Sequence, residues 1–325
     1  MSEFSRILGV GACLPRTCVS NDELVNRLAS KGVETSSEWI VSRTGIQQRF
    51  LAERDETATS MGVSAAKAAL AQAGKTALDV DLIVVATSTS DQIFPSTACS
   101  IQASLQATKA FAFDVQAVCS GFVYGLTVAN SMIRSGQVKS ALVIGTEVFS
   151  RLMDWNDRST CVLFGDGAGA VYLEQSDKPG ILGCLLKSDG SLGSILNAPG
   201  RVENGLCAGD PFLRMEGQSV FKQAVSVLGQ NAHELLEQCH VELNQLDLLV
   251  PHQANIRILQ SLGKKLGLSE EQVVATVAQH GNTSAASVPL ALEQASRHGR
   301  LKPGTLVMLQ GVGGGFTWGS VLVRM

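Results

Sequence analysis

Apolar residues follow two alternating patterns along most of the chain. Segments 80–90 and 140–147 are almost continuously apolar, which is typical of strands buried on both faces of a sheet. Segment 58–74 is rich in Ala and ends in Gly74, as expected for a helix with a glycine C-cap. Because strand-like and helix-like segments alternate, the pattern predicts a layered α/β fold.

The second half of the chain repeats the order of the first. "DVDLIVVATSTS" resembles "QLDLLVPHQAN", and the helix-like stretch that starts at Cys119 aligns with the one that starts at Asn282. Each half then ends in a Gly-rich segment, "FGDGAGAVYLEQ" in one and "GGGFTWGSVLVRM" in the other. Four similar elements in the same order favour a duplicated α/β unit over chance similarity.

This duplication predicts two halves, residues 1–178 and 179–325, joined at the polar, turn-like stretch "QSDKPG". A length of 325 residues also exceeds the common size of a single core. When the halves are superposed, Cys119 corresponds to Asn282, and both stand where a strand leads into a helix. Ligands bind at such carboxyl ends of strands in α/β folds, so we expect the two corners to meet at one central site.

Composition and charge narrow the class of protein. A content of 45% hydrophobic and 17% charged residues excludes a disordered or fibrous chain. A net charge of -3 and 5% aromatic residues give no sign of nucleic-acid binding. No apolar segment reaches the ~18 residues of a membrane span, and Glu3 is foreign to a secretory signal. Eight scattered Cys without a CxxC pair indicate reduced thiols and no zinc site, so we expect a cytoplasmic protein.

Cys119 is the first candidate for chemistry, because it stands at a predicted strand-to-helix corner in "VCSGF". The N–H groups of Ser120, Gly121 and Phe122 would have no partner inside the helix, and together with the helix dipole they favour an anion. We expect this position to lower the thiol pKa from about 8.5 toward neutrality. A buried structural cysteine is the alternative, since Cys is among the most buried residue types.

His252 and Asn282 stand at further strand-to-helix corners. Taken alone, His252 after Pro251 could be a structural histidine, and Asn282 could be a helix N-cap. His280 offers a second imidazole, but it does not occupy the matching corner of the duplication. Together, a thiolate and two neutral donors would form an acyl-transfer site. The run "GVGGGF" would add backbone N–H groups for a thioester oxyanion, and it lacks the Lys-Ser/Thr of a phosphate loop.

Seven further segments follow one another along the chain: "SEWIVSRTGIQQR", "IFPSTACSIQ", "DVQAVCSGF", "FGDGAGAV", "PHQANIRI", "HGNTSAASVP" and "GGGFTWGS". In this order they resemble the thiolase-fold condensing enzymes, and most closely the β-ketoacyl-acyl-carrier-protein synthase III family of fatty-acid initiation. Related families have a second His or a second Cys where this chain has Asn282. Chalcone-type synthases usually have a GFGPG-like loop, which "GVGGGF" does not match. The resemblance implies a thiolase-like fold with five αβαβα layers.

The activity that this resemblance implies is a decarboxylating Claisen condensation. An acyl-CoA primer, acetyl-CoA in the first instance, would react with malonyl-acyl-carrier protein to give 3-ketoacyl-carrier protein, CoA and CO2. Cys119 would take the acyl group, the N–H groups of Cys119 and Gly314 would hold the oxyanion, and His252 and Asn282 would hold the enolate. No metal or redox cofactor is implied. The alternatives are a related enzyme of secondary metabolism, with another primer or a CoA-bound extender, and a catalytically silent scaffold, which retention of all three residues disfavours.

The resemblance also implies three sets of binding residues. The CoA contacts would be Trp39, Arg43, Arg158 and Asn255. The acyl pocket would be formed by Phe94, Leu163, Phe164, Phe221 and Ala224. The acidic carrier protein would contact Lys222, Arg257, Lys264 and Lys265. Phe94 would reach the partner subunit's pocket, which implies a homodimer. Val312 stands where some relatives have Phe, so the resemblance leaves the choice of acyl primer open.

Overall fold

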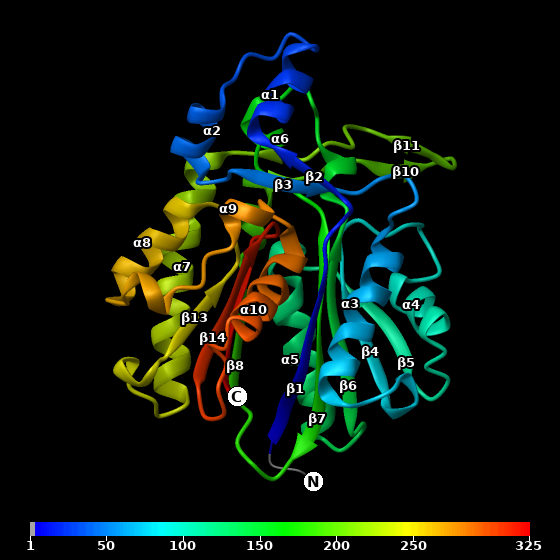
Figure 1. The fold of residues 1–325 in the computed structure, drawn as a ribbon, viewed down its shortest axis with the longest axis vertical. Coiled ribbons are helices and arrows are strands. Elements are labelled where there is room, and N and C mark those ends of the chain that lie inside the picture. Colours follow the sequence, from blue (N-terminus) through cyan, green and yellow to red (C-terminus); the bar gives the residue numbers. More distant parts are fainter. Residues whose placement is uncertain (1–3) are drawn as a thin grey trace.

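Residues 4–325, which the computed structural model describes, form two large sheets with helices between and outside them (Figure 1). The first sheet contains, in spatial order, β1 (Phe4–Cys13), β7 (Gly167–Ser176), β6 (Ser140–Glu147), β4 (Leu82–Ala86) and β5 (Phe111–Val115). The second contains β13 (Leu248–Pro251), β14 (Leu306–Gly313), β15 (Thr317–Arg324) and β8 (Ile181–Ser188). All strands of the first sheet therefore precede the β7–β8 connection in the chain, and all strands of the second sheet follow it.

The two sheets have the same topology. In the first, β4 pairs in parallel with β6, and β6, β7 and β1 follow in antiparallel order. In the second, β13 pairs in parallel with β14, and β14, β15 and β8 follow in antiparallel order. Strand β5, parallel to β4, is the additional edge strand of the first sheet. The predicted duplicated α/β architecture is confirmed.

Five layers result from this arrangement (Figure 1). Helices α5 (Gly121–Arg134) and α10 (Ser287–Arg297) lie between the sheets. Helices α3 (Ala58–Ala73) and α4 (Thr97–Leu105) cover the outer face of the first sheet, and α7 (Gly217–Gln238) and α8 (Ile256–Leu266) cover that of the second. The central layer accounts for the nearly all-apolar strands, because β6 and β14 are buried along their whole length.

Smaller elements complete the chain. The remaining α-helices are α1 (Asn21–Ala29), α2 (Ser37–Thr44), α6 (Arg158–Cys161) and α9 (Val277–His280). The short strand pairs are β2 (Thr17–Ser20) with β3 (Gln48–Leu51), β9 (Leu196–Asn197) with β12 (Arg214–Met215), and β10 (Arg201–Glu203) with β11 (Leu206–Ala208). The 3-10 turns are η1 (Ala77–Asp79), η2 (Val118–Ser120), η3 (Phe149–Leu152), η4 (Gly190–Ile195), η5 (Leu243–Gln245), η6 (Glu270–Gln272) and η7 (Ser284–Ala286).

The predicted elements compare closely with the observed ones, with one difference. Helix α3 ends at its Gly74 cap in the left-handed conformation, and β6 spans the predicted residues. The strand expected over 80–90 is shorter, because β4 stops at Ala86. The next residues turn away from the sheet, and the hydroxyls of Thr87 and Thr89 donate to the Glu147 carboxylate.

The superposition of the halves differs in register from the sequence prediction. Val118 (φ 47°) and Ser284 (φ 49°) both have left-handed backbones, and each opens a 3-10 turn directly before α5 or α10. Cys119 and Ala285 are the second residues of these two turns, and they precede the first residues of β6 and β14 by equal lengths of chain. Cys119 therefore corresponds to Ala285, and its predicted pairing with Asn282 is wrong. The small residues of "NTSAASVP" gave no signal for where the turn begins.

The two corners meet through glycines of the facing strands, as the duplication predicts. A methyl group on Gly145 would lie 2.3 Å from the carbonyl oxygen of Ala285. One on Gly311, at the corresponding position of the other half, would lie 2.7 Å from the Cα of Ser120. Contacts this short exclude any side chain at either position, so the halves pack backbone against backbone at the centre.

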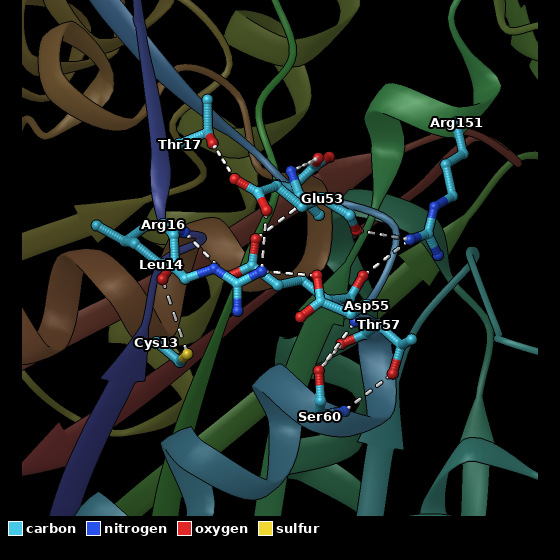
Figure 2. A network of polar contacts seen from close by, with 12 residues as sticks. Cys13, Leu14, Arg16, Thr17, Glu53, Asp55, Thr57, Ser60 and Arg151 are labelled. Carbon is cyan, nitrogen blue, oxygen red and sulfur yellow. Dashed lines mark hydrogen bonds and ion pairs between the residues drawn. The ribbon is translucent and has the colours of Figure 1, made fainter.

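A polar network fixes three segments above the first sheet (Figure 2). The guanidinium of Arg16, in the turn after β1, pairs with Glu53 at 3.0 Å and Asp55 at 2.6 Å. Arg151 of η3 donates to the carbonyl oxygens of Glu53 and Glu56. Exposed ion pairs contribute little each, but the network ties the β3–α3 connection to η3, which lines a cavity described below.

Candidate active site

A cavity of about 670 Å³ extends between the two halves and has Cys119, His252 and Asn282 in its wall. It also brings together many of the other residues expected to bind substrate: Trp39, Arg43, Leu163, Phe164, Phe221, Ala224, Asn255, Arg257 and Val312. Arg158, Phe94, Gly314, Lys222, Lys264 and Lys265 do not line it. The structure thus brings predicted residues from segments far apart in the chain together around one cavity.

Cys119 occupies the middle of the turn η2, one residue before the N-cap of α5, and is 4% exposed. Burial raises the pKa of its thiol to about 12, and the charge of Glu147 acts in the same direction. The pKa change expected from the sequence is therefore wrong in sign. The 3-10 turn uses two of the N–H groups that should have faced an anion: Ser120 donates to Ala117, and Gly121 donates to Val118.

His252 follows directly after β13, and its backbone N–H donates to the Gln310 carbonyl on β14. Its ring is 3% exposed, and burial lowers the imidazole pKa to about 3, so the side chain is neutral. Nδ1 lies 2.6 Å from the hydroxyl of Ser287 at the start of α10. Ser287 already accepts the N–H of Gln253, and within residues 4–325 its hydroxyl has no other acceptor than Nδ1. We therefore assign the hydrogen of His252 to Nε2, the donor form.

Asn282 is held by both its backbone and its side chain. Its N–H donates to the Leu163 carbonyl at 2.9 Å, and its own carbonyl accepts from Gly165 at 3.0 Å. The side-chain Oδ1 accepts the N–H of Ser284 at 2.9 Å. Because Oδ1 is occupied, the Nδ2 amino group is the end of this 5% exposed amide that remains for a ligand in the cavity. Asn282 is therefore a fixed hydrogen-bond donor.

Glu147, the last residue of β6, is a fully buried carboxylate that sequence reasoning missed. Its Oε2 accepts from Thr89, Thr87 and the N–H of Ser88, and its Oε1 accepts from the Ser284 hydroxyl at 3.0 Å. Burial raises the pKa of this carboxyl to about 7. In the sequence, Glu147 ends an apolar strand, and only its position after "SALVIGT" could have drawn attention to it.

The glycine run lies against the nucleophile. A methyl group on Gly313 would lie 2.6 Å from the backbone nitrogen of Cys119, so this position requires glycine. Gly314, the expected oxyanion donor, lies one residue further, where a Cβ would meet the Leu196 carbonyl oxygen and the Val118 side chain. The structure brings the loop to Cys119, and the role of the Gly314 N–H stays a prediction.

The outer end of the cavity is formed by α2, α6 and the start of α8. Arg158 stacks its guanidinium over the indole of Trp39, 4.9 Å from the ring centre, and donates to the Glu34 carbonyl. Asn255 caps α8 by accepting from Arg257, and its Nδ2 donates to the Arg43 carbonyl. The predicted CoA contacts therefore cluster at one end of the cavity. Both Oδ1 and Nδ2 of Asn255 already form hydrogen bonds within the protein.

A second cavity of about 400 Å³ adjoins the first, and Val118, Leu196 and Leu213 line both. Phe149, Leu152, Leu196 and Leu213 give it apolar walls. The residues expected to form the acyl pocket behave differently: Leu163, Phe164, Phe221 and Ala224 line the first cavity, whereas Phe94 is 82% exposed on a loop and lines neither. Their assignment to acyl binding stays a prediction.

The four basic residues expected to contact a carrier protein are all exposed on α7 and α8. Lys222 lies on α7, and Arg257, Lys264 and Lys265 lie on the neighbouring α8. Arg257 stacks over Phe221 at 5.7 Å and lines the mouth of the first cavity, so the group borders the path to Cys119.

Comparison with known proteins agrees with this geometry. Two family models match, 3-oxoacyl-[acyl-carrier-protein] synthase III over residues 113–190 and its C-terminal region over residues 236–325. The Bordetella petrii protein named beta-ketoacyl-[acyl-carrier-protein] synthase III is 61% identical over 322 residues, which cover 99% of this chain and 98% of that protein. The chain belongs to the synthase III family. It is thus an acyltransferase-type condensing enzyme.

Solved structures named 3-oxoacyl-acyl-carrier-protein synthase III have the same fold. The Aquifex aeolicus VF5 protein is 44% identical, with a TM-score of 0.92, and the match covers 99% of this chain and all of that chain (100%). The Pseudomonas aeruginosa PAO1 protein is 42% identical, with a TM-score of 0.92 over 99% and 98% of the two chains. The predicted thiolase-like fold of this synthase III family member is confirmed.

Within residues 4–325, no group of three or more His, Cys, Asp or Glu side chains is arranged to hold a metal ion. None of the helices in the same residues combines the length and apolar character needed to cross a membrane.

Proposed function

We propose that this protein catalyses the first condensation of fatty-acid synthesis, in which an acyl-CoA primer, acetyl-CoA in the first instance, reacts with malonyl-acyl-carrier protein. The products are 3-ketoacyl-carrier protein, CoA and CO2. One observation supports this most strongly: a single cavity has a buried Cys, a neutral His and a fixed Asn at its inner end and Trp39 and Arg43 at its outer end. The enzyme of secondary metabolism is not favoured, given the 61% identical relative.

In the first half-reaction the thiol of Cys119 attacks the thioester and the acyl group moves from CoA to the enzyme. Trp39 offers an aromatic face for the adenine base, and Arg43 and Arg158 offer cationic groups for the phosphates. Because Arg158 covers one face of the indole, a base either uses the other face or displaces the guanidinium. The backbone N–H groups of Cys119 and Gly314 would hold the oxyanion, and Gly313 packs against the Cys119 nitrogen beside them.

In the second half-reaction the malonyl group loses CO2, and its enolate attacks the acyl-Cys119. Negative charge develops on the enolate oxygen as CO2 leaves, so neutral donors stabilise this transition state more than the ground state. Nε2 of His252 and Nδ2 of Asn282 are such donors, each oriented by a bond at its other end, to Ser287 and Ser284 respectively. The proposed chemistry uses no metal or redox cofactor.

The surface supports two proposed partners. An acidic carrier protein would dock on the exposed cations of α7 and α8 beside the cavity mouth, Lys222, Arg257, Lys264 and Lys265. A second copy of this chain would pair along β5, whose outer edge has no strand partner within residues 4–325 and which begins with the exposed Phe111. The exposed Phe94, on the loop between β4 and α4, would then reach the other subunit.

The test supplies malonyl-carrier protein and a panel of acyl-CoAs, and follows CO2 release together with acylation of Cys119 by mass spectrometry. Cys119→Ser is expected to lose condensation. His252→Ala is expected to accept the acyl group but to fail in malonyl decarboxylation, because it lacks the enolate donor. If no acyl-CoA labels Cys119, the proposal is wrong. Normal decarboxylation by His252→Ala would refute the role of His252 alone.

A further inference from the structure

The direction of the Asn282 side-chain amide depends on one hydrogen bond. Its backbone is fixed by the bonds with Leu163 and Gly165, but these do not set the terminal torsion of the side chain, which is broad in asparagine. Within residues 4–325, the hydrogen bond that holds the amide is the one from the Ser284 N–H to Oδ1, at 2.9 Å. Whatever holds Ser284 therefore also directs the Nδ2 donor of Asn282.

Ser284 has a backbone conformation that needs support. Its φ of 49° lies in the left-handed region, which residues with a side chain seldom adopt. Its carbonyl accepts the N–H of Ser287 within the turn η7, and its hydroxyl donates to Oε1 of Glu147 at 3.0 Å. Glu147 ends β6, against which η7 packs, so the hydroxyl joins the turn to the opposite half of the chain.

The Glu147 carboxylate is buried and is held at its other oxygen as well. Oε2 accepts from the hydroxyls of Thr87 and Thr89 and from the Ser88 N–H at 3.1 Å. All three donors come from the connection that follows β4. Rotation of the carboxylate would leave buried polar groups without partners, which is costly. Glu147 therefore offers Ser284 an acceptor in a fixed place.

We propose that Glu147 is a positioning residue for Asn282 and acts through Ser284. The carboxylate fixes the Ser284 hydroxyl, and the N–H of the same residue fixes Oδ1 of Asn282, so that Nδ2 points into the cavity. This inference rests on the proposed function, in which Asn282 binds the enolate. It adds a residue without substrate contact that sets the geometry of the second half-reaction.

The other reacting groups are held independently of this chain of bonds. Nδ1 of His252 is bonded to the Ser287 hydroxyl at 2.6 Å. Cys119 lies in the turn η2, which packs against η7. Replacing Ser284 by Ala keeps the backbone atoms of η7, so this packing is retained. A loss of the Ser284 hydroxyl is therefore expected to affect the second half-reaction and not the acylation of Cys119.

The test starts from enzyme that acetyl-CoA has already acylated at Cys119 and from which excess primer has been removed. Malonyl-carrier protein is added at increasing concentrations, and CO2 release gives the limiting rate and the half-saturating concentration. Ser284→Ala is expected to lower the limiting rate about tenfold or more, because the enolate donor is misdirected. The half-saturating concentration and the rate of the preceding acylation should stay within about threefold of wild type.

A second variant covers the case in which Ser284→Ala does not fold. Ser284→Gly removes the same hydroxyl, and glycine adopts the left-handed φ of this position without strain. It is expected to show the same loss in limiting rate. Glu147→Ala should be as slow as the Ser284 variants, and Glu147→Gln, which keeps a hydrogen-bonding group opposite Ser284, should recover part of the rate.

Thr87→Val is the matched control, because it removes another donor to the same carboxylate. The Thr87 hydroxyl also accepts the Thr89 N–H, so this variant should lose at least as much free energy of unfolding as Ser284→Ala. It has no bond to Asn282, and its limiting rate is expected to stay within about twofold of wild type. Denaturant unfolding measured beside the rates separates a loss of stability from a loss of orientation.

A double-mutant cycle shows whether Ser284 acts through Asn282. In the wild-type background the Ser284→Ala change is expected to cost about tenfold in limiting rate. Once Asn282→Ala has removed the amide, the same change should cost less than about twofold, because there is no donor left to direct.

The outcomes separate this inference from the proposed function. If acylated wild type releases no CO2 from malonyl-carrier protein, the proposed function fails and the positioning role fails with it. If wild type reacts and the folded Ser284 variants react equally fast, only the positioning role is wrong. Equal loss in Thr87→Val, equal rates for Glu147→Gln and Glu147→Ala, or additive losses in the cycle would also overturn it. A fall in limiting rate alone, absent from the Asn282→Ala background, supports it.

Discussion

Gly313→Ala tests whether the backbone of the glycine loop fixes the position of the nucleophile. The new Cβ would lie 2.6 Å from the Cys119 nitrogen and 3.1 Å from the Ser120 nitrogen, whereas ordinary contact begins at 3.4 Å. Both neighbours are backbone atoms, so no side-chain rotation relieves the overlap. Restoring normal contact requires a displacement of about 0.8 Å, the difference between 3.4 and 2.6 Å.

A displacement of that size has two consequences. Misplacing a reacting group by about 1 Å costs about 100-fold in rate, so single-turnover acylation of Cys119 is expected to fall by that order. The added methyl group is also expected to reduce the free energy of unfolding by about 1–3 kcal/mol, because it overpacks a buried contact. Mass spectrometry measures the first effect, and denaturant unfolding measures the second.

Gly190→Ala is the matched control for this change. Its Cβ would meet no atom within 4 Å, and its φ lies outside the left-handed region, so rate and stability should stay close to wild type. The reasoning is refuted if folded Gly313→Ala acylates Cys119 within about threefold of wild type. In that case the close contact with Gly313 does not determine where the sulfur lies.

Three further predictions concern binding and pH. Trp39→Ala is expected to raise KM for acyl-CoA about tenfold or more with little change in kcat, since a stacking partner for the base is lost; an unchanged KM would argue against adenine stacking. Lys264→Glu is expected to raise KM for malonyl-carrier protein at low salt but not KM for acyl-CoA, whereas Lys67→Glu, exposed on α3, should change neither. His252 is neutral when folded, with its pKa lowered from 6.5 to about 3, so the folded state binds fewer protons than the unfolded state between these values. The free energy of unfolding should therefore fall as pH drops through that range, by up to ~1.4 kcal/mol per pH unit, and denaturation of His252→Gln should show a smaller pH dependence.

Much of the fold was predictable from local pattern. The continuously apolar segment 140–147 is a strand covered on both faces, and the glycine after the Ala-rich helix α3 is its cap. Cys119 and His252 follow β5 and β13, as expected for corners at the carboxyl ends of strands. The same expectation for Asn282 is wrong, because Asn282 lies between α9 and η7, although it lines the same cavity. These features depend on sequence neighbours or on topology, both of which a single sequence contains.

The other features of the site depend on contacts between residues far apart in the sequence, which local sequence patterns do not indicate. The pKa of Cys119 rises because the finished fold buries the thiol and uses the nearby N–H groups in a 3-10 turn. In the sequence, Glu147 cannot be distinguished from the end of an ordinary strand. The fold brings it together with the Ser284 hydroxyl, which lies far away in the sequence and donates to it from the other half. The second corner begins at Ser284. Its neighbours in the sequence are small residues that do not indicate a turn, and the left-handed backbone of Ser284 is visible only in the structure.

The corrected superposition explains how two similar halves form one site with two different sides. Glu147 is the last residue of β6 and Gly313 is the last residue of β14, so they occupy equivalent positions in the two halves. Each faces the corner of the other half: Gly313 lies against the Cys119 nitrogen, and Glu147 accepts from Ser284. A side chain at position 313 would displace Cys119, whereas the carboxylate of Glu147 accepts a hydrogen bond from Ser284 in the opposite turn. The same backbone position thus lets the Cys119 backbone approach closely on one side and places a buried carboxylate on the other.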